Sequence, residues 1–119
     1  MTIHQFYESI GVDPTTVLHR FGDNEKMLEK FLGKFLNDTT FIALESAVKE
    51  KNWEEVFRSA HTLKGICGNF DFKELYDLSS KIVEEYRASN YEPIPVLFEH
   101  LKVSYTKTLT NLKAYFSAL

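Results

Sequence analysis

The sequence predicts an all-α fold, an up-down-up-down four-helix bundle with short helices at its N-terminal end. Apolar residues recur at steps of three and four along most of the chain, which is the period of helices that bury one face. No stretch alternates polar and apolar residues as a half-buried strand does. A length of 119 residues suits one modest core, so we expect a single domain over residues 1–119.

Two short helices are expected first. Residues 2–10 form one of them, with four apolar residues on one side: Ile3, Phe6, Tyr7 and Ile10. Asp13 and Pro14 are typical of an N-cap followed by a proline at the first helical position. They predict a second short helix that stops at Gly22.

Residues 24–51 are predicted to be helical, with Asp23 or Asn24 as the N-cap. Five apolar residues follow at helical spacing: Leu28, Phe31, Leu32, Phe35 and Leu36. The spacing slips at residues 37–40 before Phe41, Leu44 and Val48 resume it. This segment is therefore either one kinked helix or two helices in tandem.

The central helix is predicted over residues 52–69. Asn52 caps it, and Glu55 is expected to reach back in a capping box. At about 100° per residue, six apolar residues fall on one side: Val56, Ala60, Leu63, Ile66, Cys67 and Phe70. His61 stands nearly opposite them. The break at residues 51–52 is very short, so this helix should run antiparallel to the one before it.

Asp71 with Glu74 predicts a second cap of the same kind, opening a helix up to about Ser89. Residues 90–95 contain two prolines and are expected to form a loop. The last helix has an apolar seam at near-heptad steps, which suits shallow-angle packing in a bundle. Its members are Phe98, Leu101, Tyr105, Leu109, Leu112, Phe116 and Leu119.

Composition excludes several classes of protein. A net charge of −3 and a pI near 5.8 argue against nucleic-acid binding, which usually needs a basic stripe. No apolar run is long enough for a membrane span, and the first residues lack the pattern of a signal peptide. The single cysteine, Cys67, lies on the apolar side and is expected to be a buried, inert thiol. We therefore expect a cytoplasmic protein.

His61 has unusual neighbours one and two turns away: Phe57, Arg58, Lys64, Gly65 and Gly68. Each glycine inside a helix costs about 0.5–1 kcal/mol relative to alanine. Either the two glycines let a neighbouring helix approach, or they leave room for a partner from outside. Both lie within about 40° of His61 and away from the apolar side, so we expect that a close partner there would come from outside. Phe57 is either an exposed contact or covered by the long N-terminal helices. His61 itself is either a solvated surface residue or a functional one.

The run Ala60-His61-Thr62-Leu63-Lys64-Gly65, followed by Asn69, resembles the signature of histidine phosphotransfer (HPt) domains of multistep two-component phosphorelays. The resemblance covers roughly residues 10–90 and includes further segments: residues 11–14, 20–23 and 27–35, Leu75 and Leu78. The chain departs from the family pattern at Asp71, where Gly is usual, and at Asn52, where Asp is frequent.

The resemblance implies a phosphocarrier in which His61 accepts a phosphoryl group. Lys64, one turn later, is then expected to offset the charge of that group, whereas without the resemblance it would be interpreted as a solvated charge. The implied partners are receiver domains of response regulators or of hybrid sensor histidine kinases. Residues expected to contact them are Phe57, Arg58, Gly65, Gly68 and Asn69. The carrier needs no cofactor of its own, because Mg²⁺ is expected from the receiver. We expect a monomer.

Two other functions are compatible with the residues. One is a helical module that docks receiver domains without transferring phosphate, which would not require His61. The other is a metal-binding bundle, which the absence of paired Glu or His ligands at helical spacing disfavours. No glycine-rich phosphate loop is present, so ATP-dependent enzyme activity is not expected.

Overall fold

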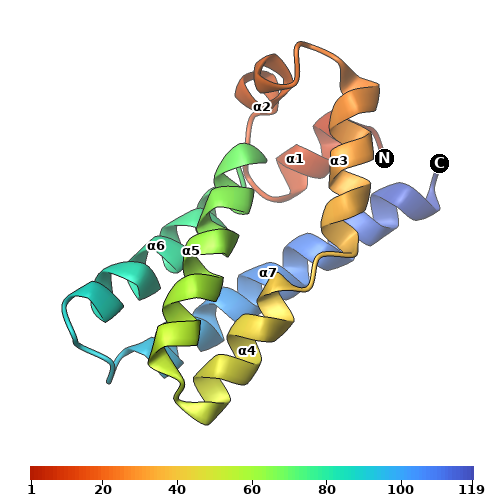
Figure 1. The fold of residues 1–119 in the computed structure, drawn as a ribbon. Coiled ribbons are helices and arrows are strands. Elements are labelled where there is room, and N and C mark those ends of the chain that lie inside the picture. The colour runs from red at the N-terminus through yellow and green to blue at the C-terminus, as the bar shows by residue number, and fades with distance from the viewer.

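The computed structural model describes all 119 residues, which form seven helices and no strand. Their bounds are α1 Ile3–Ser9, α2 Thr15–Arg20, α3 Glu25–Leu36, α4 Thr40–Glu50, α5 Trp53–Asn69, α6 Lys73–Arg87 and α7 Ile94–Ser117. Helix α4 contacts α5, α5 contacts α6, α6 contacts α7, and α7 contacts α4, which closes a four-helix bundle (Figure 1). The predicted all-α bundle with short N-terminal helices is confirmed.

The segment over residues 24–51 is two helices in tandem. Helix α3 ends at Leu36, and α4 begins at Thr40, whose N–H donates to the Asp38 carboxylate (2.8 Å). Helix α3 then extends beyond the bundle along α7, and α1 packs against α7 as well. Both termini lie at this end of the molecule (Figure 1).

Two predicted caps are present: the side-chain oxygens of Asn24 and Asn52 accept hydrogen bonds from backbone N–H groups three residues later, at 3.0 and 3.3 Å. Each satisfies a donor that the first turn of a helix leaves without a partner. The predicted cap at Asp13 is wrong by one residue, because α2 begins at Thr15 with Pro14 in the N-cap position; the Asp13 carboxylate still accepts a hydrogen bond from the Thr15 N–H at 2.9 Å.

Two further details of the predicted caps are wrong, for the same reason. The chain turns between helices through a left-handed residue, Lys51 (φ 54°) and then Asp71 (φ 56°). The Asn52 N–H therefore bonds the Ala47 carbonyl (3.0 Å), and Glu55 does not close a capping box. Asp71 belongs to the end of α5 and does not cap α6, which begins after Phe72 without a side-chain cap.

The C-terminal region differs from the prediction at two points. The loop ends at Pro93, and Pro95 lies inside the first turn of α7, where a proline sacrifices no helical hydrogen bond. Leu119 lies beyond α7 and is 70 % exposed, so the seam of this helix ends at Phe116, which is partly buried.

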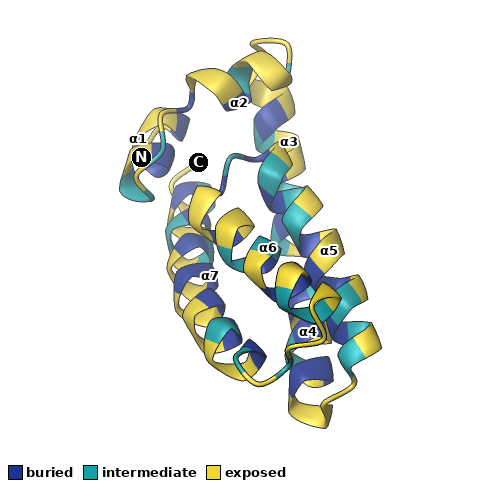
Figure 2. Cartoon of the chain, turned by 90° about the vertical axis from the view of Figure 1, so that its left-hand side faces the viewer, coloured by how far each residue is buried: buried dark blue, intermediate teal, exposed yellow.

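The core runs through the bundle and into the N-terminal helices. Figure 2 shows the buried faces turned inward along the long helices. At the α1 end, Phe6 and Tyr7 pack against Phe72, with ring centroids 6.1 and 6.0 Å apart. Cys67 is fully buried, as predicted, and burial raises the pKa of its thiol to about 12. No helix combines the length and apolar character required to cross a bilayer.

Leu63→Ala should lower the free energy of unfolding by about 2–5 kcal/mol, because Leu63 is fully buried in the centre of α5. Urea denaturation followed by circular dichroism measures this loss. The neighbouring Thr62→Ala is the matched control on the exposed face and should change stability by less than about 0.5 kcal/mol. Equal losses in both variants would contradict the assigned buried face.

Candidate functional site

His61 lies midway along α5 on the solvent-exposed side of the helix. Ala60 and Leu63, which belong to the apolar stripe on the opposite side of the helix, are fully buried. Helical periodicity therefore places the imidazole outward, as the sequence predicts. Two surface hollows, of about 660 and 430 Å³, lie near α5, and neither is lined by His61. Its surroundings suit contact with another protein better than enclosure of a small molecule.

Phe57, one turn before His61, is half-buried under the C-terminal part of α6. Its ring stacks on Tyr86 with centroids 4.7 Å apart, and the Arg87 guanidinium carbon lies 5.5 Å from its centroid. The Phe57 and His61 rings are 5.8 Å apart. The aromatic ring and the cation that lie against Phe57 both come from α6, so its side chain is only partly exposed. Phe57 supports one side of the imidazole.

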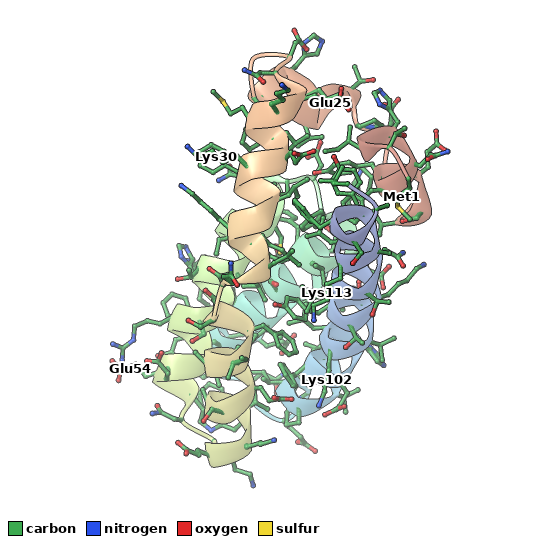
Figure 3. The ribbon with its side chains drawn as sticks, turned by 90° about the vertical axis from the view of Figure 1, so that its right-hand side faces the viewer. Met1, Glu25, Lys30, Glu54, Lys102 and Lys113 are labelled. Carbon is green, nitrogen blue, oxygen red and sulfur yellow. The ribbon has the colours of Figure 1, made fainter.

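Arg58 forms ion pairs with two carboxylates of its own helix. Its guanidinium lies 3.1 Å from Glu54 and 3.4 Å from Glu55. Figure 3 shows Glu54 on the outer side of α5, directed toward solvent. These pairs offset the charge of Arg58, so it contributes less positive potential beside His61 than the sequence suggests.

Lys64, one turn after His61, is half-buried and forms no ion pair with a carboxylate. Its Nζ instead lies 5.7 Å from the ring centroid of Tyr76 on α6. An aromatic face attracts an ammonium group without cancelling its charge. The positive charge of Lys64 is thus held at the junction of α5 and α6.

The two glycines of α5 lie in different surroundings. No heavy atom would come within 4 Å of a Cβ added at Gly65, so the helix surface beside His61 is open there. A Cβ at Gly68 would lie 3.3 Å from the Tyr76 ring. The expectation that only an outside partner approaches both glycines is wrong for Gly68, because α6 already does.

Asn69 ends α5, and its backbone is held by α2. Arg20 Nη1 donates to the Asn69 and Gly68 carbonyls at 2.9 and 3.1 Å and pairs with Asp71 at 3.3 Å. A cation at the C-terminus of a helix satisfies free carbonyls and opposes the helix dipole. This contact fixes the end of the helix that carries His61.

Sequence reasoning did not identify Tyr76, Tyr86, Arg87 or Arg20 as neighbours of the site. The first three lie on α6, and their closeness to α5 depends on how the two helices are rotated about their axes. The sequence offered one indication. Leu75 is buried, and the helical period then places Tyr76, the next residue, at the edge of the buried face of α6. The helical period could therefore have identified Tyr76 as partly exposed, but not its contacts with Lys64 and Gly68.

Comparison with protein families matches residues 26–115 to the model described as Hpt domain. Comparisons with curated proteins and with solved structures found no significant match. The matched region contains α3 to α6 nearly in full and most of α7, and therefore includes His61 and each α6 residue near it.

Gly65→Ala should raise the free energy of unfolding by up to about 1 kcal/mol, since alanine favours the helix and the site is open. Gly68→Ala should gain less, or lose, because the Tyr76 ring must move to admit the new methyl group. Urea denaturation of both variants measures the difference. A larger gain at Gly68 than at Gly65 would contradict the packing of Tyr76 against α5.

Proposed function

The chain belongs to the Hpt domain family, whose members take part in histidine phosphotransfer in phosphorelays, and we propose that its own phosphoryl acceptor is His61. In this proposal His61 takes a phosphoryl group from the aspartyl phosphate of one receiver domain and passes it to the aspartate of another. The family consists of phosphocarriers, so the covalent intermediate is on the protein and no ATP is used by it. We further propose that residues 1–119 act as one domain and as a cytoplasmic monomer.

The exposure of His61 beside the open surface at Gly65 is the observation that carries the proposal. Phosphoryl transfer requires the attacking and leaving atoms to lie roughly in line with phosphorus. A lone pair on an imidazole nitrogen forms the N–P bond, while the P–O bond to the receiver's carboxylate breaks and its electron pair returns to that carboxylate. A smooth helix surface next to the ring allows a receiver to approach along this line.

Lys64 is proposed to offset the charge of the phosphorylated ring. A phosphoryl group adds close to two negative charges, and an ammonium group one turn away attracts them. In a largely solvated site this attraction is worth about 1 kcal/mol. An interaction of that size orients the group yet lets it leave, which suits a carrier.

The proposed partners are receiver domains of response regulators or of hybrid sensor histidine kinases. Mg²⁺ is assigned to the receiver, and the structure holds no group of three His, Cys, Asp or Glu side chains placed to bind a metal ion. Gly65 and the exposed Arg58 and Asn69 are proposed to contact the receiver directly. Phe57 and Gly68 are proposed to shape the same surface through their packing against α6.

His61→Gln should abolish phosphohistidine formation, because glutamine offers no nucleophilic ring nitrogen. The protein is incubated with several receiver domains that acetyl phosphate and Mg²⁺ have phosphorylated, and acid-labile, base-stable label is measured. Helical content should not change, since the position is exposed. Label that persists in His61→Gln would assign the chemistry to another residue. Receivers that bind without labelling the unaltered protein would favour a docking module that does not transfer phosphate.

Lys64→Ala should slow transfer, or shift its equilibrium away from phosphohistidine, by roughly tenfold, the effect of removing one partly exposed charge. Single-turnover transfer from a phosphorylated receiver measures both quantities. Lys113→Ala is the matched control, because Lys113 is an exposed lysine on α7 outside this surface (Figure 3). Equal losses in the two variants would show a general charge effect and contradict the role given to Lys64.

A further inference from the structure

Tyr76 connects Lys64 and Gly68 across the junction of α5 and α6. It lies in the first turn and a half of α6, and its side chain is 37 % exposed. One edge of its ring would be 3.3 Å from a Cβ at Gly68, and its face lies 5.7 Å from Lys64 Nζ. The Tyr76 ring thus packs against Gly68 of α5 and contacts the ammonium group of Lys64 on the same helix.

The missing side chain of Gly68 makes this position of the ring possible. A Cβ at 3.3 Å would be tighter than ordinary van der Waals contact and would push the ring away from α5. The nearby Gly65 has no such neighbour. Gly68 therefore has a role within the molecule that is separate from the open surface beside His61.

The two cations that flank His61 on α5 are held in different ways. Arg58 pairs with Glu54 and Glu55, whose carboxylates offset its charge. Lys64 rests on an uncharged ring and has no carboxylate partner. Contact with an aromatic face restricts where the ammonium group goes and leaves its full charge available to an anion. Of the two cations, only Lys64 has an ammonium group that is both restricted in position and free of a carboxylate that offsets its charge.

We propose that Tyr76 is a positioning residue for phosphoryl transfer, which acts by holding Lys64 beside the surface on which His61 is phosphorylated. This inference rests on the proposed function and extends it to a residue of α6. The aromatic ring performs the role, and the phenolic hydroxyl is not required. Tyr76 itself does not contact the phosphoryl group.

Tyr76→Leu should reduce the rate of phosphohistidine formation about two- to fivefold, the effect expected when an exposed cation–π contact is lost. Phosphoramidate is the phosphoryl donor, so no cognate receiver is needed. Its P–N bond breaks and ammonia leaves with the electron pair as the imidazole nitrogen bonds to phosphorus. Tyr76→Phe should retain the original rate. In a Lys64→Ala background, Tyr76→Leu should cause no further loss, because the residue acts through the lysine.

A second measurement needs no phosphorylation. In the unmodified protein, the ring current of Tyr76 should shift the terminal methylene protons of Lys64 in the NMR spectrum, and Tyr76→Leu should remove this shift. Circular dichroism checks that the variants remain folded.

Several results would overturn the inference while the proposed function stands. The first is that Tyr76→Phe forms phosphohistidine as slowly as Tyr76→Leu. The second is that Tyr76→Leu lowers the rate by the same factor in the Lys64→Ala background as in the unaltered protein. The third is that the Lys64 methylene protons show no ring-current shift. A different result, no phosphohistidine on the unaltered protein from either phosphoramidate or phosphorylated receivers, would reject the proposed function and this inference with it. The NMR measurement would still report the Lys64–Tyr76 contact in that case.

Discussion

Burial of one face of α5 determines where every other part of the site can lie. Ala60, Leu63 and Cys67 are fully buried, and at 3.6 residues per turn their burial forces His61 to the opposite side. Helices α4 and α6 pack on either flank of α5 and leave the His61 strip uncovered. The exposed histidine is thus a consequence of hydrophobic packing beneath it, since no hydrogen bond in the structure holds the side chain outward.

Helix α6 completes the surface around that histidine. Its Tyr86 and Arg87 cover Phe57 before His61, and its Tyr76 meets Lys64 and Gly68 after it. The two aromatic contacts bracket the imidazole along the helix without covering it. Aromatic rings give this surface a fixed shape, and the cations that rest on them keep their charge. The result is a firm but accessible surface.

The sequence was sufficient for the parts that depend on local pattern. The period of three to four predicted the helices and the position of His61, and short polar residues before apolar runs predicted the caps of Asn24 and Asn52. The sequence did not predict the local structure where one residue fits two different roles. Asp71 with Glu74 has the spacing of a cap, but the short turn requires a left-handed residue there, and that requirement prevails. The contacts of Phe57, Gly68 and Arg20 were also out of reach, because they depend on how separate helices are rotated against one another.

The hydrogen bonds of Arg20 show how far the structural unit extends. The match to the family model begins at residue 26, yet Arg20, which precedes it, binds the last carbonyls of α5, and Phe6 and Tyr7 of α1 are fully buried in the shared core. A fragment cut to the matched residues would expose the aromatic faces that α1 covers and free the end of the histidine-bearing helix. Boundaries drawn from family similarity alone would therefore pass through the hydrophobic core, and expression of the isolated match would yield a less stable protein than the chain as it stands.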